Sequence, residues 1–338
     1  MSDIAVRPAR ADDSEAVFDL CAHTWPGGDY IPYVWDQWLA DPDSALLVAL
    51  AGTRPVGLVH MRMMSPDEGW LEGIRVDPNA RRQGIGRVLV SRALVAAHER
   101  GAAVVRLITD HDNLPAQALF AHFGFTRIAE VRRYQWSARD DAPENASEDT
   151  SETRAAVAEN GSSLASESIM SGQTAAPGAS ISAESDGDVH DGARIVTPGE
   201  AAFERIWEWL VQSNLAPLTG GLEFDGWSAR ALAEPFLRAE LAAGRVYVLE
   251  EWGTILALAV VRDAADTEGK QSSLDVRYID GLSEAIGRLA LVLREVAQER
   301  RLRRVELWLP DLLILRDAMD GAGYTGNNNP MWVYARTL

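Results

Sequence analysis

A glycine-rich turn flanked by arginines is the part of this sequence whose residue types are best suited to chemistry. Gly84 and Gly86 open a segment with helical apolar spacing, and Arg81, Arg82 and Arg87 lie beside them. Glycine lets the backbone approach a ligand closely, and the unpaired amides at a helix N-terminus favour anions. The turn is therefore predicted to bind phosphate oxygens.

Two common phosphate-binding motifs do not fit this turn. A Walker A loop needs Lys followed by Ser or Thr after its last glycine, whereas Arg87 and Val88 follow Gly86. A dinucleotide fingerprint needs a third glycine or alanine where Leu89 stands. An ordinary strand-to-helix turn stays open as the alternative for the two glycines taken alone.

The elements that must position this turn follow from apolar patterning and turn residues. The first two strands are expected to form an antiparallel hairpin, and the turn itself joins the third strand to a helix that begins at Ile85. The predicted strands are 46–50, 56–64, 70–76, 103–109 and one that ends at Trp136, and a short helix is predicted over 114–122.

Two motifs occur here in the order and spacing of a known superfamily. Arg-x-x-Gly-x-Gly occupies residues 81–86, and Asn-x-x-Ala-x-x-Leu-Phe-x-x-x-Gly-Phe occupies residues 113–125. Together they resemble the GCN5-related N-acetyltransferase (GNAT) superfamily over residues 1–138. The resemblance implies that this region uses acetyl coenzyme A (acetyl-CoA) as a co-substrate and transfers the acetyl group directly to an amine.

The resemblance also implies which residues meet the acetyl donor. In the superfamily, amides of the glycine loop hold the pyrophosphate, and the preceding strand pairs with the pantetheine arm. The second motif contacts the donor near its thioester. Carried over to this chain, the implied donor-binding residues are Ile74, Arg75, Val76, Arg81, Arg82, Gln83, Gly84, Ile85, Gly86, Arg87, Asn113 and Phe120.

Acetyl transfer needs a base for the amine and a proton source for the departing thiolate. Glu72 stands nine residues before the first motif, where several members of the superfamily carry a general base; a surface carboxylate is the alternative. Phe120 replaces the usual tyrosine and cannot donate a proton, so protonation of the thiolate is left to water or to another residue, or the domain binds the donor without turning it over. Tyr134 is predicted to substitute, with His111 and His122 as further candidates, and structural roles are the alternative for all three.

The acceptor is expected near the first helices. Asp29 is predicted to pair with a substrate ammonium, and Tyr30 and Tyr33 to stack on a small ligand or hydrogen-bond it. The alternative is a loop whose aromatic side chains fill the space between helix and sheet.

Charge divides the chain into three segments. The net charge is −18, and residues 139–192 carry 12 acidic residues against two arginines without any aromatic residue. Such a stretch cannot bury enough apolar surface to order itself. We therefore expect an acetyl-CoA-binding domain at 1–138, a disordered acidic linker at 139–192 and a second domain at 193–338.

The second domain repeats the order of elements of the first. Its expected strands are 246–251, 254–262, 274–279, 304–309 and 331–336, with helices at 283–300 and 312–322. Only Asp280-Gly281-Leu282 stands where the phosphate loop would be, so a degenerate acetyltransferase-like domain is predicted.

The fold class predicted for the whole chain is α/β (α+β), with two GNAT-like domains, each a mixed and mostly antiparallel sheet flanked by helices. The degenerate domain is expected to complete the acceptor cleft or an interface. Trp207, Trp209 and Trp227 are expected to serve packing.

Composition excludes several classes. Excess acidity argues against binding duplex DNA, and Cys21 as the single cysteine argues against disulfides and a Cys-rich metal site, which favours the cytoplasm. The sequence contains no apolar run of the kind that predicts a signal peptide or a membrane span. The expected partner is a small-molecule or amino-acid amine, with no metal and with a homodimer left open. A non-catalytic acyl-CoA sensor and a protein N-terminal acetyltransferase are the alternatives.

Overall fold

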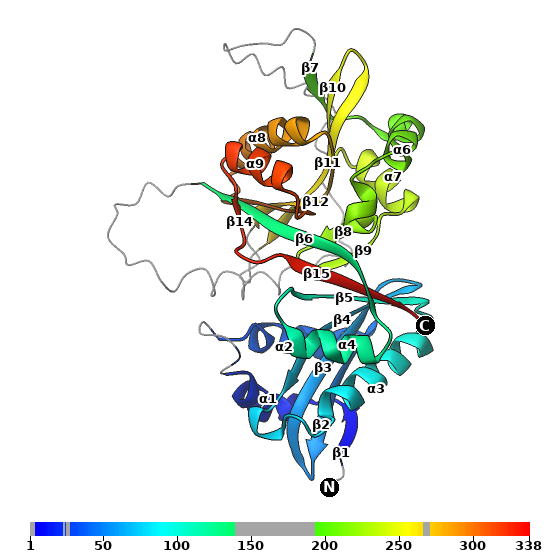
Figure 1. The fold of residues 1–338 in the computed structure, drawn as a ribbon, viewed down its shortest axis with the longest axis vertical. Coiled ribbons are helices and arrows are strands. Elements are labelled where there is room, and N and C mark those ends of the chain that lie inside the picture. The colour runs from blue at the N-terminus through cyan, green and yellow to red at the C-terminus, as the bar shows by residue number, and fades with distance from the viewer. Residues whose placement is uncertain (1–3, 23, 25–27, 139–192, 266–270) are drawn as a thin grey trace, which may run out of the picture.

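The computed structural model describes residues 4–338 except 23, 25–27, 139–192 and 266–270. The predicted acidic linker lies outside the described residues. The rest of the chain forms two lobes, one above the other in Figure 1.

The first lobe consists of strands and helices from the N-terminal half. Its elements are β1 (Ile4–Pro8), α1 (Ser14–Cys21), α2 (Ile31–Ala40), β2 (Ser44–Ala51), β3 (Arg54–Ser65), β4 (Glu68–Val76), α3 (Ile85–Glu99), β5 (Val104–Asp110), α4 (Leu114–His122) and β6 (Thr126–Ser137).

The second lobe follows the undescribed segment. Its elements are β7 (Ala193–Val196), α6 (Phe203–Val211), β8 (Leu222–Asp225), β9 (Ser228–Ala231), α7 (Glu234–Ala242), β10 (Val246–Glu251), β11 (Thr254–Ala265), β12 (Gln271–Gly281), α8 (Ser283–Glu299), β13 (Arg304–Pro310), α9 (Leu313–Gly321), β14 (Thr325–Gly326) and β15 (Met331–Thr337).

The mixed, mostly antiparallel sheet with flanking helices is confirmed, and every strand and helix predicted from the sequence is present. Besides the helices α6 and α7 and the two-residue strand β14, the sequence analysis missed the short strands β1 and β7 and the hairpin of β8 and β9. Strands β1, β7, β8 and β9 are only four or five residues long, which is too short for a clear alternation of apolar and polar residues.

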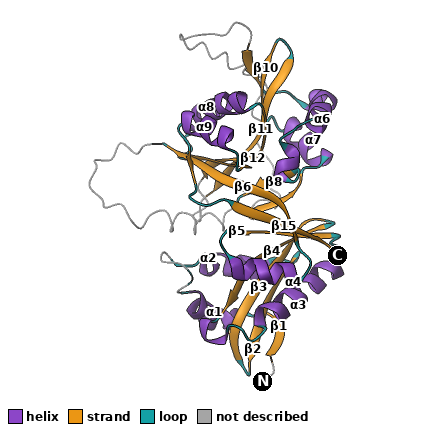
Figure 2. Ribbon diagram, in the orientation of Figure 1, coloured by secondary structure: helices purple, strands orange, loops and turns teal. Residues whose placement is uncertain are grey.

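Helices cover both faces of the first lobe's sheet (Figure 2). On β2, Leu47 and Ala49 pack with α3, whereas Leu46 and Val48 pack with α1 and α2. Because side chains alternate along a strand, these two sets lie on opposite faces. The sheet therefore has one face under α3 and α4 and the other under α1 and α2.

The two lobes share one continuous sheet in which the last strands are exchanged. The order is β1-β2-β3-β4-β5-β15-β6-β13-β12-β11-β10-β7. The second lobe's last strand, β15, pairs with β5, and the first lobe's last strand, β6, pairs with β15 on one side and with β13 on the other. The sequence analysis expected one sheet per domain, and the exchange joins those sheets.

No helix in the described part of the chain is both long and apolar enough to cross a membrane.

The exchange predicts that damage to β15 destabilises both lobes. Val333 is completely buried between β5 and β6. We expect Val333→Asp to lower the free energy of unfolding by about 3 kcal/mol or more, because it buries a charge without a partner. Urea unfolding measures the change in the free energy of unfolding, and amide hydrogen exchange shows which strands lose protection.

Thr337→Asp, at an exposed position of the same strand, is the matched control and should change stability little. Loss of protection in β3 with β11 left untouched would show that the lobes are independent.

Candidate functional site

The site begins where β4 and β5 diverge. The two strands pair in parallel only from Glu68 to Trp70 and from Val104 to Arg106. Beyond this point the two strands no longer pair, and both line a cavity. This cavity adjoins a second one on the face covered by α3 and α4. We call the part between the strands the inner pocket and the part beside α3 the outer pocket.

The outer pocket measures about 870 Å³ and surrounds the glycine-rich turn. Most of the donor-binding residues implied by the resemblance border it, and Gln83 does not. Those that line it are Ile74, Arg75, Val76, Arg81, Arg82, Gly84, Ile85, Gly86, Arg87, Asn113 and Phe120.

The turn presents backbone amides at the start of α3. Gly84 has a positive φ of 84°, which glycine adopts without strain. The first intrahelical hydrogen bond runs from Val88 N–H to the Gly84 carbonyl (3.1 Å). The N–H groups of residues 85–87 therefore have no partner inside the helix and can donate to an anion in the outer pocket.

The second motif closes the other side of the cavity. Asn113 caps α4, because its Oδ1 accepts the Ala116 N–H (3.2 Å) while its Nδ2 donates to Thr109 Oγ1 (3.3 Å). The ring of Phe120 packs near those of Phe125 and Tyr334. Asn113 and Phe120 border both pockets, so this motif lies where the two pockets join.

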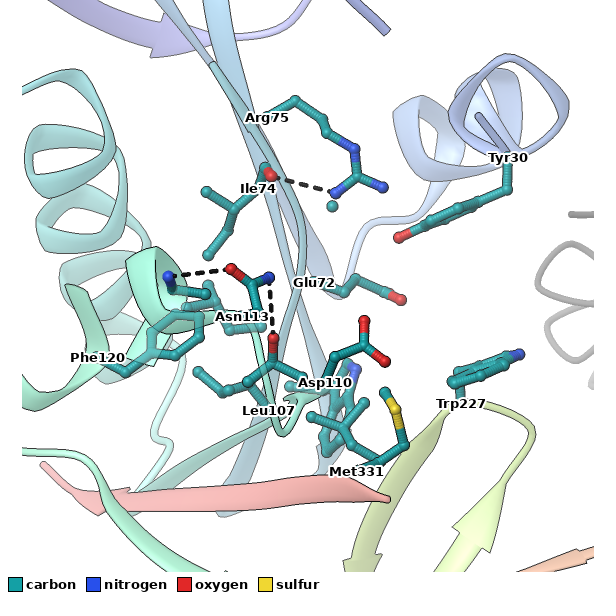
Figure 3. A pocket seen from close by; sticks show the side chains of 16 residues that line it. Tyr30, Glu72, Ile74, Arg75, Leu107, Asp110, Asn113, Phe120, Trp227 and Met331 are labelled. Carbon is teal, nitrogen blue, oxygen red and sulfur yellow. Dashed lines mark hydrogen bonds between the residues drawn. The ribbon is translucent and has the colours of Figure 1, made fainter. Parts of the chain in front are cut away.

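The inner pocket measures about 350 Å³ and is mainly apolar (Figure 3). Glu72, Asp110 and Asn113 are among its polar side chains. The lining residues are Tyr30, Trp70, Leu71, Glu72, Gly73, Ile74, Arg75, Leu107, Ile108, Thr109, Asp110, Asn113, Ala116, Phe120, Trp227 and Met331.

Glu72 is anchored by two neighbours on β3. Its Oε1 lies 3.0 Å from His60 Nδ1 and 3.4 Å from Arg62 Nε. An ionised carboxylate only accepts hydrogen bonds, so His60 donates from Nδ1. Burial alone would raise the pKa of Glu72, but the His60 hydrogen bond and the Arg62 charge outweigh it, so the pKa is lowered. His60, itself fully buried, stacks on Trp38 with 4.1 Å between ring centroids.

Asp110, at the end of β5, is a second carboxylate in the inner pocket and was not predicted from the sequence. Burial and the nearby charge of Asp112 raise the pKa of Asp110, and His111 opposes this more weakly. The pKa values of Glu72 and Asp110 thus move in opposite directions. Two carboxyl groups with separated pKa values are a common feature of sites that handle protons.

The structure corrects the roles expected for the first helices. Asp29 is buried and bonded to Arg75, with 2.7 Å between Oδ2 and Nε, so its carboxylate is already neutralised inside the protein. Tyr33 is 61% exposed and borders neither pocket. Tyr30 does line the inner pocket, with the Arg75 guanidinium 5.6 Å from its ring centre.

The structure does not bring Tyr134 to the site. Its side chain is 1% exposed within the core of the second lobe, where β6 pairs with β13 and β14. Burial raises the pKa of Tyr134 to about 12. The expectation of a proton donor at this position is corrected, because β6 leaves the first lobe before it reaches residue 134. His111 and His122 border neither pocket.

Two inner-pocket residues come from the second half of the chain. Trp227 lies in the turn between β8 and β9, and Met331 begins β15 opposite Asp110. The sequence analysis assigned Trp227 to packing. The Asp225-Gly226 pair before it is a hairpin signal that predicts a turn, but nothing local shows that this turn reaches the other half.

At the corresponding point of the second lobe, β12 runs to Gly281 and α8 begins at Ser283. Asp280 is buried there and accepts hydrogen bonds from Ser213 (2.7 Å) and Tyr278 (2.6 Å). This short connection has no room for a loop like residues 77–84.

Comparison with known proteins shows what the region around this site is similar to. The family model described as "Acetyltransferase (GNAT) family" matches residues 14–125. Mycothiol acetyltransferase of Beutenbergia cavernae is 33% identical over 99 residues, which is 29% of this chain and 30% of that protein. The chain thus spans under a third of this relative's length.

Two further comparisons extend this result. Aminoglycoside N(6')-acetyltransferase type 1 of Klebsiella aerogenes is 27% identical over 143 residues, 38% of this chain and 94% of that protein. The structure of a GCN5-related N-acetyltransferase from Sphaerobacter thermophilus superposes with a TM-score of 0.56 at 12% identity, covering 99% of this chain and 95% of that one. The latter likeness concerns the fold of both lobes.

The contacts of Glu72 predict how its pKa responds to mutation. His60→Leu removes a hydrogen-bond donor to the Glu72 carboxylate, so the pKa of Glu72 should rise. The carboxylate would then lose its charge at a higher pH than in the parent protein. A ¹³C NMR titration of the Glu72 carboxyl group measures the shift.

His98→Leu, on the exposed end of α3, is the control, and His60→Asn, which keeps a donor, should restore part of the shift. An unchanged Glu72 titration in His60→Leu would contradict the assigned hydrogen bond.

Proposed function

From the premise that residues 14–125 belong to the acetyltransferase (GNAT) family, we propose that this protein is an N-acetyltransferase. It moves an acetyl group from acetyl-CoA to the primary amine of a small molecule or amino acid. The observation that carries the proposal is the pair of adjoining pockets, one around the glycine-rich turn and one in the gap between β4 and β5 with Glu72 in its lining.

The outer pocket is the proposed donor site. The amides of residues 85–87, together with Arg81, Arg82 and Arg87, suit a pyrophosphate. The edge of β4 at residues 74–76 has no neighbouring strand on the β5 side, so its backbone groups can pair with an amide-bearing arm. Gly86 keeps the helix start close to α4, because a Cβ there would lie 3.3 Å from Leu119.

Glu72 is the proposed base. The acceptor arrives as an ammonium and must lose one proton before it can attack. Glu72 accepts that proton, directly or through water, and its lowered pKa means that it passes the proton on to solvent rather than keeping it.

The acetyl transfer itself forms a C–N bond and breaks the thioester C–S bond. The C–S bond breaks as the thiolate leaves, and the nitrogen gives its second proton to water to form the neutral amide. Phe120 has no proton to give and Tyr134 lies in the other lobe's core, so we assign protonation of the thiolate to water from the open outer pocket.

The second half of the chain is proposed to complete the acceptor site. Trp227 and Met331 line the inner pocket together with residues of β4 and β5. The pocket volume of about 350 Å³ suits a small acceptor better than an extended peptide. The missing loop between β12 and α8 supports the proposal that the second lobe is a degenerate domain with no donor site of its own.

The donor site predicts a specific loss of binding. Gly84→Glu places a carboxylate and a strained backbone in the turn, and we expect the Kd for acetyl-CoA to rise at least about tenfold through lost charge-assisted hydrogen bonds. Titration calorimetry measures the Kd. Thiol release with a panel of primary amines measures turnover in the parent protein.

Gly52→Glu is the matched control, since Gly52 also has a positive φ with open space around it and lies in the turn between β2 and β3. Equal acetyl-CoA affinity in the parent and Gly84→Glu would refute the donor site. Binding of acetyl-CoA without release of its thiol in the presence of any amine would show that the protein is an acyl-CoA sensor and not an enzyme.

A further inference from the structure

The inner pocket brings two carboxylates from neighbouring strands to the same place. Glu72 of β4 and Asp110 of β5 both line this pocket, and Figure 3 shows the two side chains in it. Two carboxylates that line one mainly apolar pocket each attract a positive charge into it. This part of the pocket therefore favours a positively charged ligand.

The two carboxylates differ in what already neutralises them. Glu72 has His60 and Arg62 as partners. Within the described residues, the carboxylate of Asp110 has neither a hydrogen bond nor an ion pair; Asp112 and His111 are the charged or titratable neighbours that act on it. The cationic Arg75 lining the same pocket is bound to Asp29. An incoming ammonium would find its open partner at Asp110.

The pocket also has an apolar side, which is fixed in place and begins next to Asp110. The ring centroids of Trp227 and Trp308 lie 5.2 Å apart in an edge-on contact. The Arg133 guanidinium lies over the Trp227 ring, 5.2 Å from its centroid. Met331 begins β15 in register with Asp110, and Trp70 and Ile108 lie nearby. A ligand whose ammonium reaches Asp110 would place its remaining atoms against this wall.

We propose that the acceptor is a compact monoamine with an apolar body, which binds as a cation with its ammonium at Asp110 and Glu72 and its body against Trp227 and Met331. This inference rests on the proposed acetyltransferase function and narrows its substrate. The pocket volume of about 350 Å³ lies at the low end for ligand sites and matches a single small ring or a short aliphatic chain.

The same contacts disfavour two other kinds of amine. A free amino acid would bring its own carboxylate toward Glu72 and Asp110, while Arg75 is engaged by Asp29. An aminoglycoside would bury several hydroxyl and ammonium groups against Trp227 and Met331, which offer few hydrogen-bond partners, and unpaired polar groups are costly to bury.

Steady-state thiol release in the full chain tests the inference with four acceptors: 2-phenylethylamine, phenylalanine, ethylamine and an aminoglycoside. We expect kcat/KM for 2-phenylethylamine to exceed that for phenylalanine and the aminoglycoside by about tenfold or more. Asp110→Asn should raise the KM for 2-phenylethylamine about tenfold, because a charge-assisted hydrogen bond is lost. The Kd for acetyl-CoA is measured in the same variant, because Asp110 also borders the outer pocket, and the KM is compared at saturating acetyl-CoA.

Variants of the apolar wall give the second part of the test. Trp227→Ala should raise the KM for 2-phenylethylamine several-fold while leaving that for ethylamine nearly unchanged, and Trp227→Leu covers the case in which Trp227→Ala fails to fold. Trp252→Ala is the matched control, since Trp252 is 79% exposed in the turn between β10 and β11.

The outcomes separate the two proposals. Turnover that prefers phenylalanine or the aminoglycoside, or an equal effect of Trp227→Ala and Trp252→Ala, would overturn the monoamine assignment and leave the acetyltransferase intact. Glu72→Gln should lower kcat by a similar factor for every acceptor. No thiol release from any amine would remove the acetyltransferase function and this inference with it.

Discussion

The divergence of β4 from β5 beyond Trp70 is the constraint on which the rest of the structure depends. A strand edge inside a sheet carries backbone N–H and C=O groups that are costly to leave unpaired when buried. Gly73 contributes to the divergence, since its φ of 62° and the Trp38 ring, 2.8 Å from where a Cβ would stand, suit glycine alone. The resulting gap is reached from the α3 face and from the α2 face, so a donor and an acceptor can meet within it.

A sheet opened in this way needs support on its other side, and the exchanged strands supply it. β15 pairs with the whole length of β5, from Met331 opposite Asp110 to Thr337 opposite Val104, and β6 holds β15 in turn. The same exchange carries Met331 into the inner pocket and brings the hairpin of β8 and β9, with Trp227, over it. The acceptor side of the site is therefore built by both halves of the chain.

Local features of the site could be predicted from the sequence, and long-range ones could not. The glycine turn, Asn113 and Phe120 lie within two short motifs, and the structure places them around one cavity. Tyr134 was misplaced because the sequence does not show that β6 crosses into the second lobe. Asp29 is buried against Arg75, which lies 46 residues further along the chain. Trp227 is far from β4 and β5 in the sequence and lines the same pocket only because the chain folds back on them. These pairings depend on which strands become neighbours, which apolar patterning leaves undetermined.

The central claim is that one anionic acetyl donor binds along the diverging strand β4 and the start of α3. Amide hydrogen exchange, measured with and without acetyl-CoA, tests it most directly because it reports on the backbone groups themselves. The account predicts slower exchange at residues 74–76 and 84–87, with no change at residues 283–286, where the second lobe begins its corresponding helix. Unchanged exchange at 84–87, or equal slowing at 283–286, would contradict it.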